Sequence, residues 1–122
     1  MNGIDFFADT NAILYFLTGN DCMKPYISAK FAYSVISEME LLSFPKLSNE
    51  EEKSICSILN KNTSLPITNE VKKETISIRR KYNIKLPDAI IAATSITTGL
   101  PLLTADVVFE KISELNLVLL KP

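Results

Sequence analysis

The stretch Ile4-Asp5-Phe6-Phe7-Ala8-Asp9-Thr10-Asn11 decides the fold, because it joins a short apolar run directly to the start of a helix. Residues 4–8 are typical of a buried strand, and the pattern over residues 11–17 predicts a helix. The carboxylate of Asp9 comes just after the strand. A strand that passes at once into a helix begins a parallel crossover unit, so this stretch favours an α/β fold.

The same alternation of strand and helix continues along the chain. Further strands are expected at residues 31–35, 64–67, 102–104 and 117–120. Further helices are expected at residues 37–43, 48–60, 69–82, 89–97 and 107–114, with a short helical piece at 22–28. The apolar character of the strands indicates a sheet covered on both faces. We therefore expect one α/β/α layered domain over residues 1–122, with a mainly parallel sheet of about five short strands.

Two local signals mark helix ends. Ser48-Asn49-Glu50-Glu51 matches a capping box, in which a serine and a glutamate three residues later satisfy each other's backbone N–H groups. Leu86-Pro87-Asp88 begins the most apolar helix, since proline suits the first helical turn, and Gly99 is the expected C-cap.

The composition is that of a folded cytoplasmic protein. The chain has 122 residues, of which 47% are hydrophobic and 22% charged, enough for a single core. Its apolar runs are far shorter than the roughly 20 residues of a membrane span, and no signal peptide is visible. Cys22 and Cys56 lack metal-type spacing and are expected to be reduced. We expect no contact with a membrane.

Two absences narrow the chemistry. The chain contains no histidine, which excludes Ser-His-Asp triads, Cys-His dyads and histidine-ligated zinc. Its three glycines form neither a dinucleotide-binding GxGxxG motif nor a Walker A motif. An enzyme with this composition has to rely on carboxylates, with a metal that prefers oxygen ligands.

Four acids follow strands or begin helices. Asp9 and Asp106 come after strands, Asp88 begins the most apolar helix, and Glu40 lies in the helix after the second strand. In parallel sheets the functional crevice lies beyond the carboxyl ends of the strands, so these acids are expected to converge there. Converging carboxylates repel one another, and a bound Mg²⁺ or Mn²⁺ turns that repulsion into binding.

Each acid also has a purely structural interpretation. Asp9 and Asp106 are suited to capping the helices that follow them, and Asp88 to interacting with a helix dipole. Glu40 has apolar neighbours one turn away, which favours a position against packed apolar surface. Glu38 lies in the same, nearly all-apolar helix, so periodicity leaves open which glutamate belongs to a site.

One segment is basic although the chain's net charge is −1. Residues 72–85 contain six basic side chains and one acidic one. Arg79, Arg80 and Lys81 are the densest part of this segment and are candidates for contacts with RNA phosphates, with a solvated helix face as the alternative.

Four segments together resemble the ordered motifs of PIN-domain ribonucleases, and most of all the VapC toxins of bacterial toxin–antitoxin pairs. These segments are FADTN (7–11), SVISEMELL (34–42), LPDAIIAA (86–93) and LTADVVF (103–109). Each motif is weak alone, but their order and spacing extend the resemblance from residue 4 to residue 120. Ser43 stands where family members often have glycine.

The resemblance implies a ligand set and a reaction. The implied catalytic and metal-binding acids are Asp9, Glu40, Asp88 and Asp106, with Asn11 and Thr104 in support. It selects Glu40 over Glu38, and it implies Mg²⁺- or Mn²⁺-dependent hydrolysis of RNA phosphodiester bonds.

The resemblance also implies partners: an RNA substrate, a second copy of the chain in a homodimer, and a VapB-like antitoxin. The alternative is a silent PIN-like module that binds RNA or an antitoxin without cutting. A haloacid dehalogenase-type phosphatase is disfavoured because Asn11 stands where its second aspartate belongs. A receiver domain is disfavoured because the third strand is followed by Thr68-Asn69 rather than an aspartate.

Overall fold

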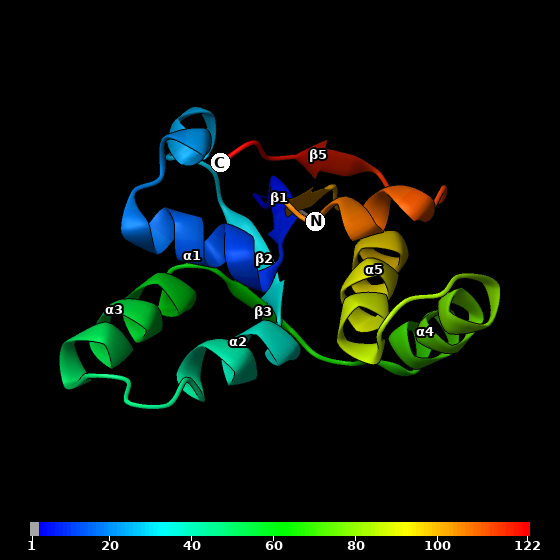
Figure 1. Cartoon of the computed structure of the whole chain (residues 1–122), viewed down its shortest axis with the longest axis horizontal. Helices are drawn as coiled ribbons and strands as arrows, with labels where there is room; N and C mark the ends of the chain where they lie inside the picture. The colour runs from blue at the N-terminus through cyan, green and yellow to red at the C-terminus, as the bar shows by residue number, and fades with distance from the viewer. Residues whose placement is uncertain (1–2) are drawn as a thin grey trace.

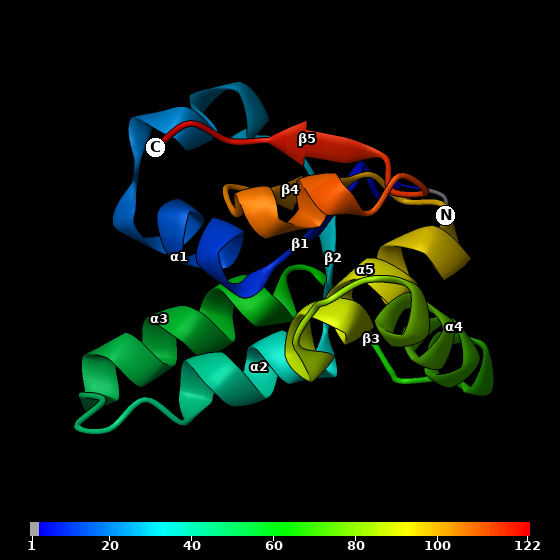
Figure 2. The ribbon, with the colours of Figure 1, turned by 45° about the vertical axis from the view of Figure 1, so that its right-hand side comes forward.

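The computed structural model describes residues 3–122, which form an α/β fold with a five-stranded, all-parallel sheet (Figures 1 and 2). The strands are β1 Phe6–Ala8, β2 Phe31–Ser34, β3 Thr63–Leu65, β4 Leu102–Thr104 and β5 Leu117–Leu119. Their order across the sheet is β3-β2-β1-β4-β5, and every neighbouring pair is parallel. The predicted fold class is confirmed.

Helices connect the strands and cover the sheet. The α-helices are α1 Thr10–Thr18, α2 Val35–Leu42, α3 Asn49–Asn60, α4 Asn69–Lys81 and α5 Leu86–Thr98. Two 3₁₀-helices, η1 Asp21–Tyr26 and η2 Val107–Lys111, complete the described elements. In Figure 1, α1 and α3 lie to one side of the strands, and α4 and α5 lie to the other. No helix among residues 3–122 has the length and apolar character needed to cross a membrane.

The expected helix over 107–114 is wrong in type and length. The chain forms only the short 3₁₀-helix η2 there, and Ile112 already has extended backbone angles. Phe109 and Ile112 are both buried, and their spacing of three matches the three residues per turn of a 3₁₀-helix. The β-branched Val107 and Val108 also favour an α-helix only weakly. The short piece expected at 22–28 is likewise a 3₁₀-helix, η1.

The predicted helix caps are present. Ser48 Oγ accepts a hydrogen bond from the Glu51 N–H at 3.1 Å, and Glu51 Oε1 accepts one from the Ser48 N–H at 3.0 Å. Gly99 ends α5 in the left-handed conformation, with φ of 73°, which glycine adopts without the steric cost of a Cβ atom.

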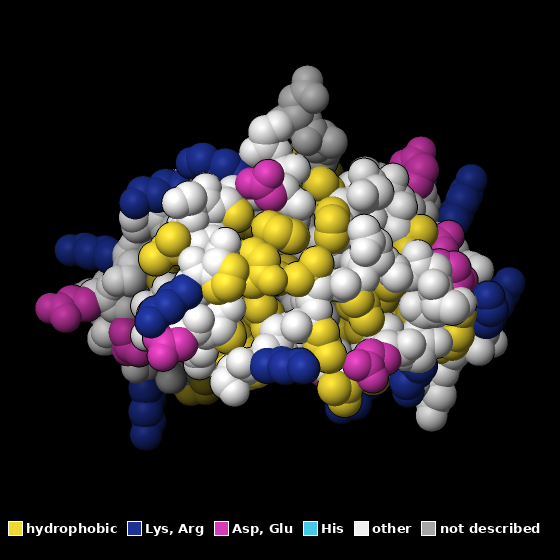
Figure 3. All heavy atoms as spheres, turned by 90° about the horizontal axis from the view of Figure 1, so that it is seen from above, with side chains coloured by type: hydrophobic (Ala, Val, Ile, Leu, Met, Phe, Trp, Pro, Cys, Tyr) yellow, Lys and Arg dark blue, Asp and Glu magenta, His cyan; other side chains and the backbone are white. Residues whose placement is uncertain are grey.

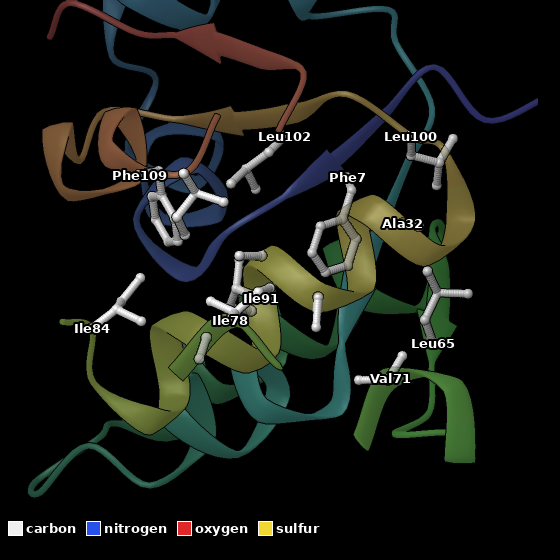
Figure 4. Close-up of a cluster of buried hydrophobic side chains, with 14 residues drawn as sticks. Phe7, Ala32, Leu65, Val71, Ile78, Ile84, Ile91, Leu100, Leu102 and Phe109 are labelled. Atoms are coloured by element: carbon white, nitrogen blue, oxygen red, sulfur yellow. The ribbon is translucent and has the colours of Figure 1, made fainter. Parts of the chain in front are cut away.

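Two cores lie on opposite faces of the sheet, because successive strand residues point to opposite sides. Phe7 and Leu102 pack into one core with α4, α5 and η2, drawn in Figure 4. Ala8 and Leu103, the next residues along, pack into the other core with α1 and α3. The edge strand β5 is only half-buried, and the face seen from above in Figure 3 has hydrophobic side chains gathered near its middle.

The strand order positions a crevice. The chain leaves β1 toward β2 and β3 on one side, and later returns to β4 and β5 on the other. The pair β1 and β4 is therefore the switch point of the sheet, and ligands of open α/β sheets bind beyond the carboxyl ends of such strands. Asp9 directly follows β1, and Asp106 follows β4 by two residues.

Candidate active site

A pocket of about 210 Å³ lies at this switch point. It contains all four acids that the sequence brought forward, each from a different element: Asp9, Glu40, Asp88 and Asp106. We call it the acidic pocket. Asn11 also lines it. Its apolar wall includes Ile91 and Phe109, which belong to the first core, so the pocket is backed by packed side chains (Figure 4).

Asp9 is the most buried of the four acids, with 7% of its surface exposed. Its Oδ1 caps α1 by accepting a hydrogen bond from the Ala12 N–H at 2.9 Å. Its Oδ2 accepts a hydrogen bond from Thr104 Oγ1 at 2.5 Å. Burial raises the pKa of Asp9 to about 6, against the lowering effect of these two hydrogen bonds, and the nearby charges of Asp106 and Asp88 raise it further. Asp9 therefore caps α1, as the structural interpretation expected, and it also lines the acidic pocket.

Thr104 joins the ends of β1 and β4. Its hydroxyl donates to Asp9 and accepts a hydrogen bond from the Asp106 N–H at 3.0 Å. Asp106 in turn caps η2, since its Oδ1 accepts from the Val108 N–H at 2.9 Å. The fully buried Thr104 side chain thus sets the relative positions of two pocket acids.

Thr104→Val is expected to lower the free energy of unfolding by about 1–3 kcal/mol, because the buried Asp9 Oδ2 and the Asp106 N–H both lose their partner. Since the Thr104 hydrogen bond lowers the pKa of Asp9, that pKa is expected to rise in the variant. Urea unfolding measures the change, and Thr104→Ser, which keeps the hydroxyl, is the matched control. Equal losses in both variants would show that the hydroxyl is not the important group.

Glu40 is held at the pocket by a chain of hydroxyl groups. Thr10 Oγ1 donates to Glu40 Oε1 at 2.6 Å and lies 2.9 Å from Ser37 Oγ. Ser37 is fully buried, whereas Glu40 is exposed, so the expectation of packed apolar surroundings for Glu40 is wrong. Glu38 does not line the pocket. Burial raises the pKa of Tyr33, and the charge of Glu38 raises it further.

Thr10 and Ser37 were not among the predicted site residues. Thr10 lies between two residues that were, and Ser37 lies one helical turn before Glu40. Both positions were therefore open to inference from spacing on a helix. The Thr10 hydroxyl orients Glu40, because a carboxylate can only accept hydrogen bonds and needs a donor beside it, and Ser37 Oγ contacts that hydroxyl in turn.

Asp88 lies in the first turn of α5, just after Pro87, as predicted. It is half-buried, and burial raises its pKa; the charges of Asp106 and Glu40 raise it further, whereas Lys85 lowers it. The acids therefore act on one another through space. This mutual repulsion is what a divalent cation relieves.

The donor set fits a hard divalent cation in chemistry. Four carboxylates and the Asn11 amide face one small pocket, and carboxylate and amide oxygens are the ligands that Mg²⁺ and Mn²⁺ prefer. Within residues 3–122, however, no three acidic or cysteine side chains form a compact metal-ligating cluster. These residues therefore fit a divalent cation in the type of ligand they offer and in the pocket they share.

The predicted RNA-binding residues lie outside the acidic pocket, in the last turn of α4. Arg79 Nε donates to the Ile84 carbonyl at 3.3 Å. Lys81 forms an ion pair with Glu114 at 3.3 Å. Arg80 is exposed to solvent. Two of the three predicted cations thus already have partners in the fold.

Comparison with known proteins identifies the domain type. The family model described as PIN domain matches residues 6–115. No curated protein sequence matches the chain.

Solved structures resemble the chain over nearly its whole length. A toxin–antitoxin complex from Klebsiella pneumoniae contains a chain 27% identical to this one, with a TM-score of 0.79, covering 93% of this chain and 96% of that one. VapBC2 from Rickettsia felis, solved with a promoter DNA fragment, matches at 18% identity and TM-score 0.85, covering 97% and 100%. VapBC-1 from nontypeable Haemophilus influenzae matches at 21% identity and TM-score 0.74, covering 95% and 98%.

Proposed function

The chain belongs to the PIN domain family, and from this we propose that it is a Mg²⁺- or Mn²⁺-dependent endoribonuclease, the toxin of a toxin–antitoxin pair that inhibits translation and growth. The resemblance that the sequence motifs indicated is thereby confirmed at the level of the family. The observation that carries the proposal is the acidic pocket, where acids from four separate elements meet at the switch point of the sheet.

The proposed roles follow from what each side chain contacts. Asp9, Glu40, Asp88 and Asp106 would hold the cation, with Asn11 beside them. Thr104 orients Asp9, and Thr10 orients Glu40. A bound Mg²⁺ or Mn²⁺ supplies an activated water and offsets negative charge on the phosphoryl oxygens. The chain's own contribution is to hold the acids in place before substrate arrives.

The proposed partners are a small VapB-like antitoxin, an RNA substrate and a second copy of the chain, in the cytoplasm. Support for the antitoxin comes from the solved relatives, which include a toxin–antitoxin complex and VapBC complexes. Apolar side chains on the face in Figure 3 provide surface for a partner chain to cover.

The direct test uses purified protein stripped of metal and incubated with end-labelled total RNA, with and without Mg²⁺ or Mn²⁺. Discrete cleavage that requires the metal supports the nuclease and identifies its RNA. Absence of cleavage with both metals, in protein shown to be folded, would favour the silent binding module instead.

Arg80→Glu is expected to weaken binding of single-stranded RNA, because the exposed end of α4 would then repel phosphates. The slope of log Kd against log salt is expected to become shallower by about 0.7 for each phosphate that the protein no longer neutralises. Fluorescence anisotropy in the Asp9→Asn background measures this without cleavage. Lys53→Glu, an equal charge reversal on the exposed side of α3, is the control. Equal affinity and slope in both variants would exclude Arg80 from the interface.

A further inference from the structure

The loop that joins α4 to α5, residues 82–85, is held by side chains from both sides. Arg79 Nε donates to the carbonyl of Ile84 at 3.3 Å. Lys111 Nζ donates to the carbonyl of Asn83 at 2.9 Å. The hydroxyl of Tyr82 donates to the carboxylate of Glu114. These contacts fix a loop whose last residue, Lys85, directly precedes the helix that carries Asp88.

Lys85 occupies a defined place beside the acidic pocket. It is the N-cap residue of α5, and its carbonyl accepts a hydrogen bond from the Ala89 N–H at 2.9 Å. Pro87 and Asp88, two and three residues later, line the pocket. The side chain of Lys85 is exposed, and it forms no ion pair with any residue of the described range 3–122.

Other cationic side chains near this loop already have partners in the fold. Lys81 is paired with Glu114, and Arg79 and Lys111 hold the loop's carbonyl groups. Lys85, in contrast, stands at the N-terminus of α5, the helix whose first turn carries Pro87 and Asp88 into the acidic pocket. A positive charge at the rim of an acidic pocket has a clear use if the substrate is an anion that has to approach four carboxylates.

We propose that Lys85 is a positioning residue that binds a backbone phosphate of RNA next to the one being cleaved. The inference rests on the proposed nuclease function. It assigns a substrate contact to a residue other than the predicted Arg79, Arg80 and Lys81. A lysine suits the task, since its ammonium is a compact charge with three donors on a flexible stem. The hydrogen bonds to the loop 82–85 hold its backbone in place, so that the flexible side chain extends from a fixed position.

The test compares Lys85→Met with Lys85→Arg and with Lys72→Met, an exposed lysine near the other end of α4. With a labelled single-stranded RNA oligonucleotide, Lys85→Met is expected to raise KM about tenfold, as for removal of a charged hydrogen bond, with little change in kcat. In the Asp9→Asn background its salt slope for RNA binding should fall by about 0.7. Lys85→Arg should keep wild-type values, because the charge and donors remain.

The outcomes separate this inference from the nuclease proposal. A KM and a salt slope for Lys85→Met equal to those of Lys72→Met would overturn it. A purely structural role would lower the unfolding midpoint and leave the salt slope unchanged, which would also overturn it. If the wild-type protein cleaves no RNA, the nuclease proposal fails, but the binding measurement still decides whether Lys85 contacts the phosphate backbone.

Discussion

Asp9→Asn is expected to lower kcat/KM for metal-dependent RNA cleavage by about a thousandfold, which corresponds to about 4 kcal/mol of lost transition-state stabilisation. The substitution removes one negative charge from the acidic pocket and changes the shape of the side chain very little. The asparagine oxygen can still cap α1 at the Ala12 N–H, and the Thr104 oxygen can accept a hydrogen bond from the new amide. We therefore expect the variant to lose catalytic activity and to keep its fold.

The matched control is Asp21→Asn, which removes the same charge from an exposed position at the start of η1. Its ion pair with Lys24 is exposed on both sides and contributes little to stability. Rates are measured at several Mg²⁺ and Mn²⁺ concentrations, and circular dichroism verifies the fold of each variant. If Asp9→Asn cleaves as fast as Asp21→Asn, the acidic pocket is not the catalytic centre.

The second large effect concerns stability in the absence of metal. The pKa of Asp9 is raised from its ordinary 3.8 to about 6, so the folded state binds this proton more tightly than the unfolded state. The stability that Asp9 contributes should therefore fall as the pH rises from about 4 to about 6, and then level off. At 1.36 kcal/mol per pKa unit, the fall is about 3 kcal/mol.

Asp9→Asn lacks this titration and is expected to be more stable than the wild-type protein at pH 7.5, while the two converge near pH 4. Urea unfolding across this range, plotted as the difference between the two proteins, isolates Asp9. The difference also cancels the opposite contribution of Glu114, whose pKa is lowered to about 2 by its Tyr82 hydrogen bond. A flat difference curve would contradict the prediction.

A bound divalent cation should offset the stability that the protein loses when Asp9 ionises. A cation that binds only the folded state adds about 2.7 kcal/mol at a hundred times its Kd. Mn²⁺ is therefore expected to restore the stability of the wild-type protein at pH 7.5 and to have much less effect on Asp9→Asn. Equal stabilisation of both proteins would place the bound ion away from Asp9.

The sequence predicted what depends on local pattern. Alternating strands and helices specified the parallel sheet, and strand ends specified where acids would gather. Capping residues such as Ser48 and Gly99 set helix ends, and both are as expected. Periodicity alone could not separate Glu38 from Glu40, because the surrounding helix is apolar on nearly every side.

What the sequence could not show depends on contacts between distant residues. The Thr10 hydroxyl reaches Glu40 across 30 positions, and Lys81 meets Glu114 across 33. Clustering of charge indicated that Lys81 is available to RNA, whereas the fold gives it an acidic partner. The roles of the pocket acids and of the basic residues in binding metal and RNA stay predictions until they are measured.

The hydrogen bond between Asp9 and Thr104 joins positions 95 residues apart in the chain. During synthesis, a ribosome therefore releases Asp9 long before the strand that has to lie beside it. The acidic pocket cannot assemble until β4 has emerged and docked against β1. If this pocket is the site of the proposed RNA cleavage, a nascent chain cannot cut RNA before residues 102–104 have emerged and formed β4.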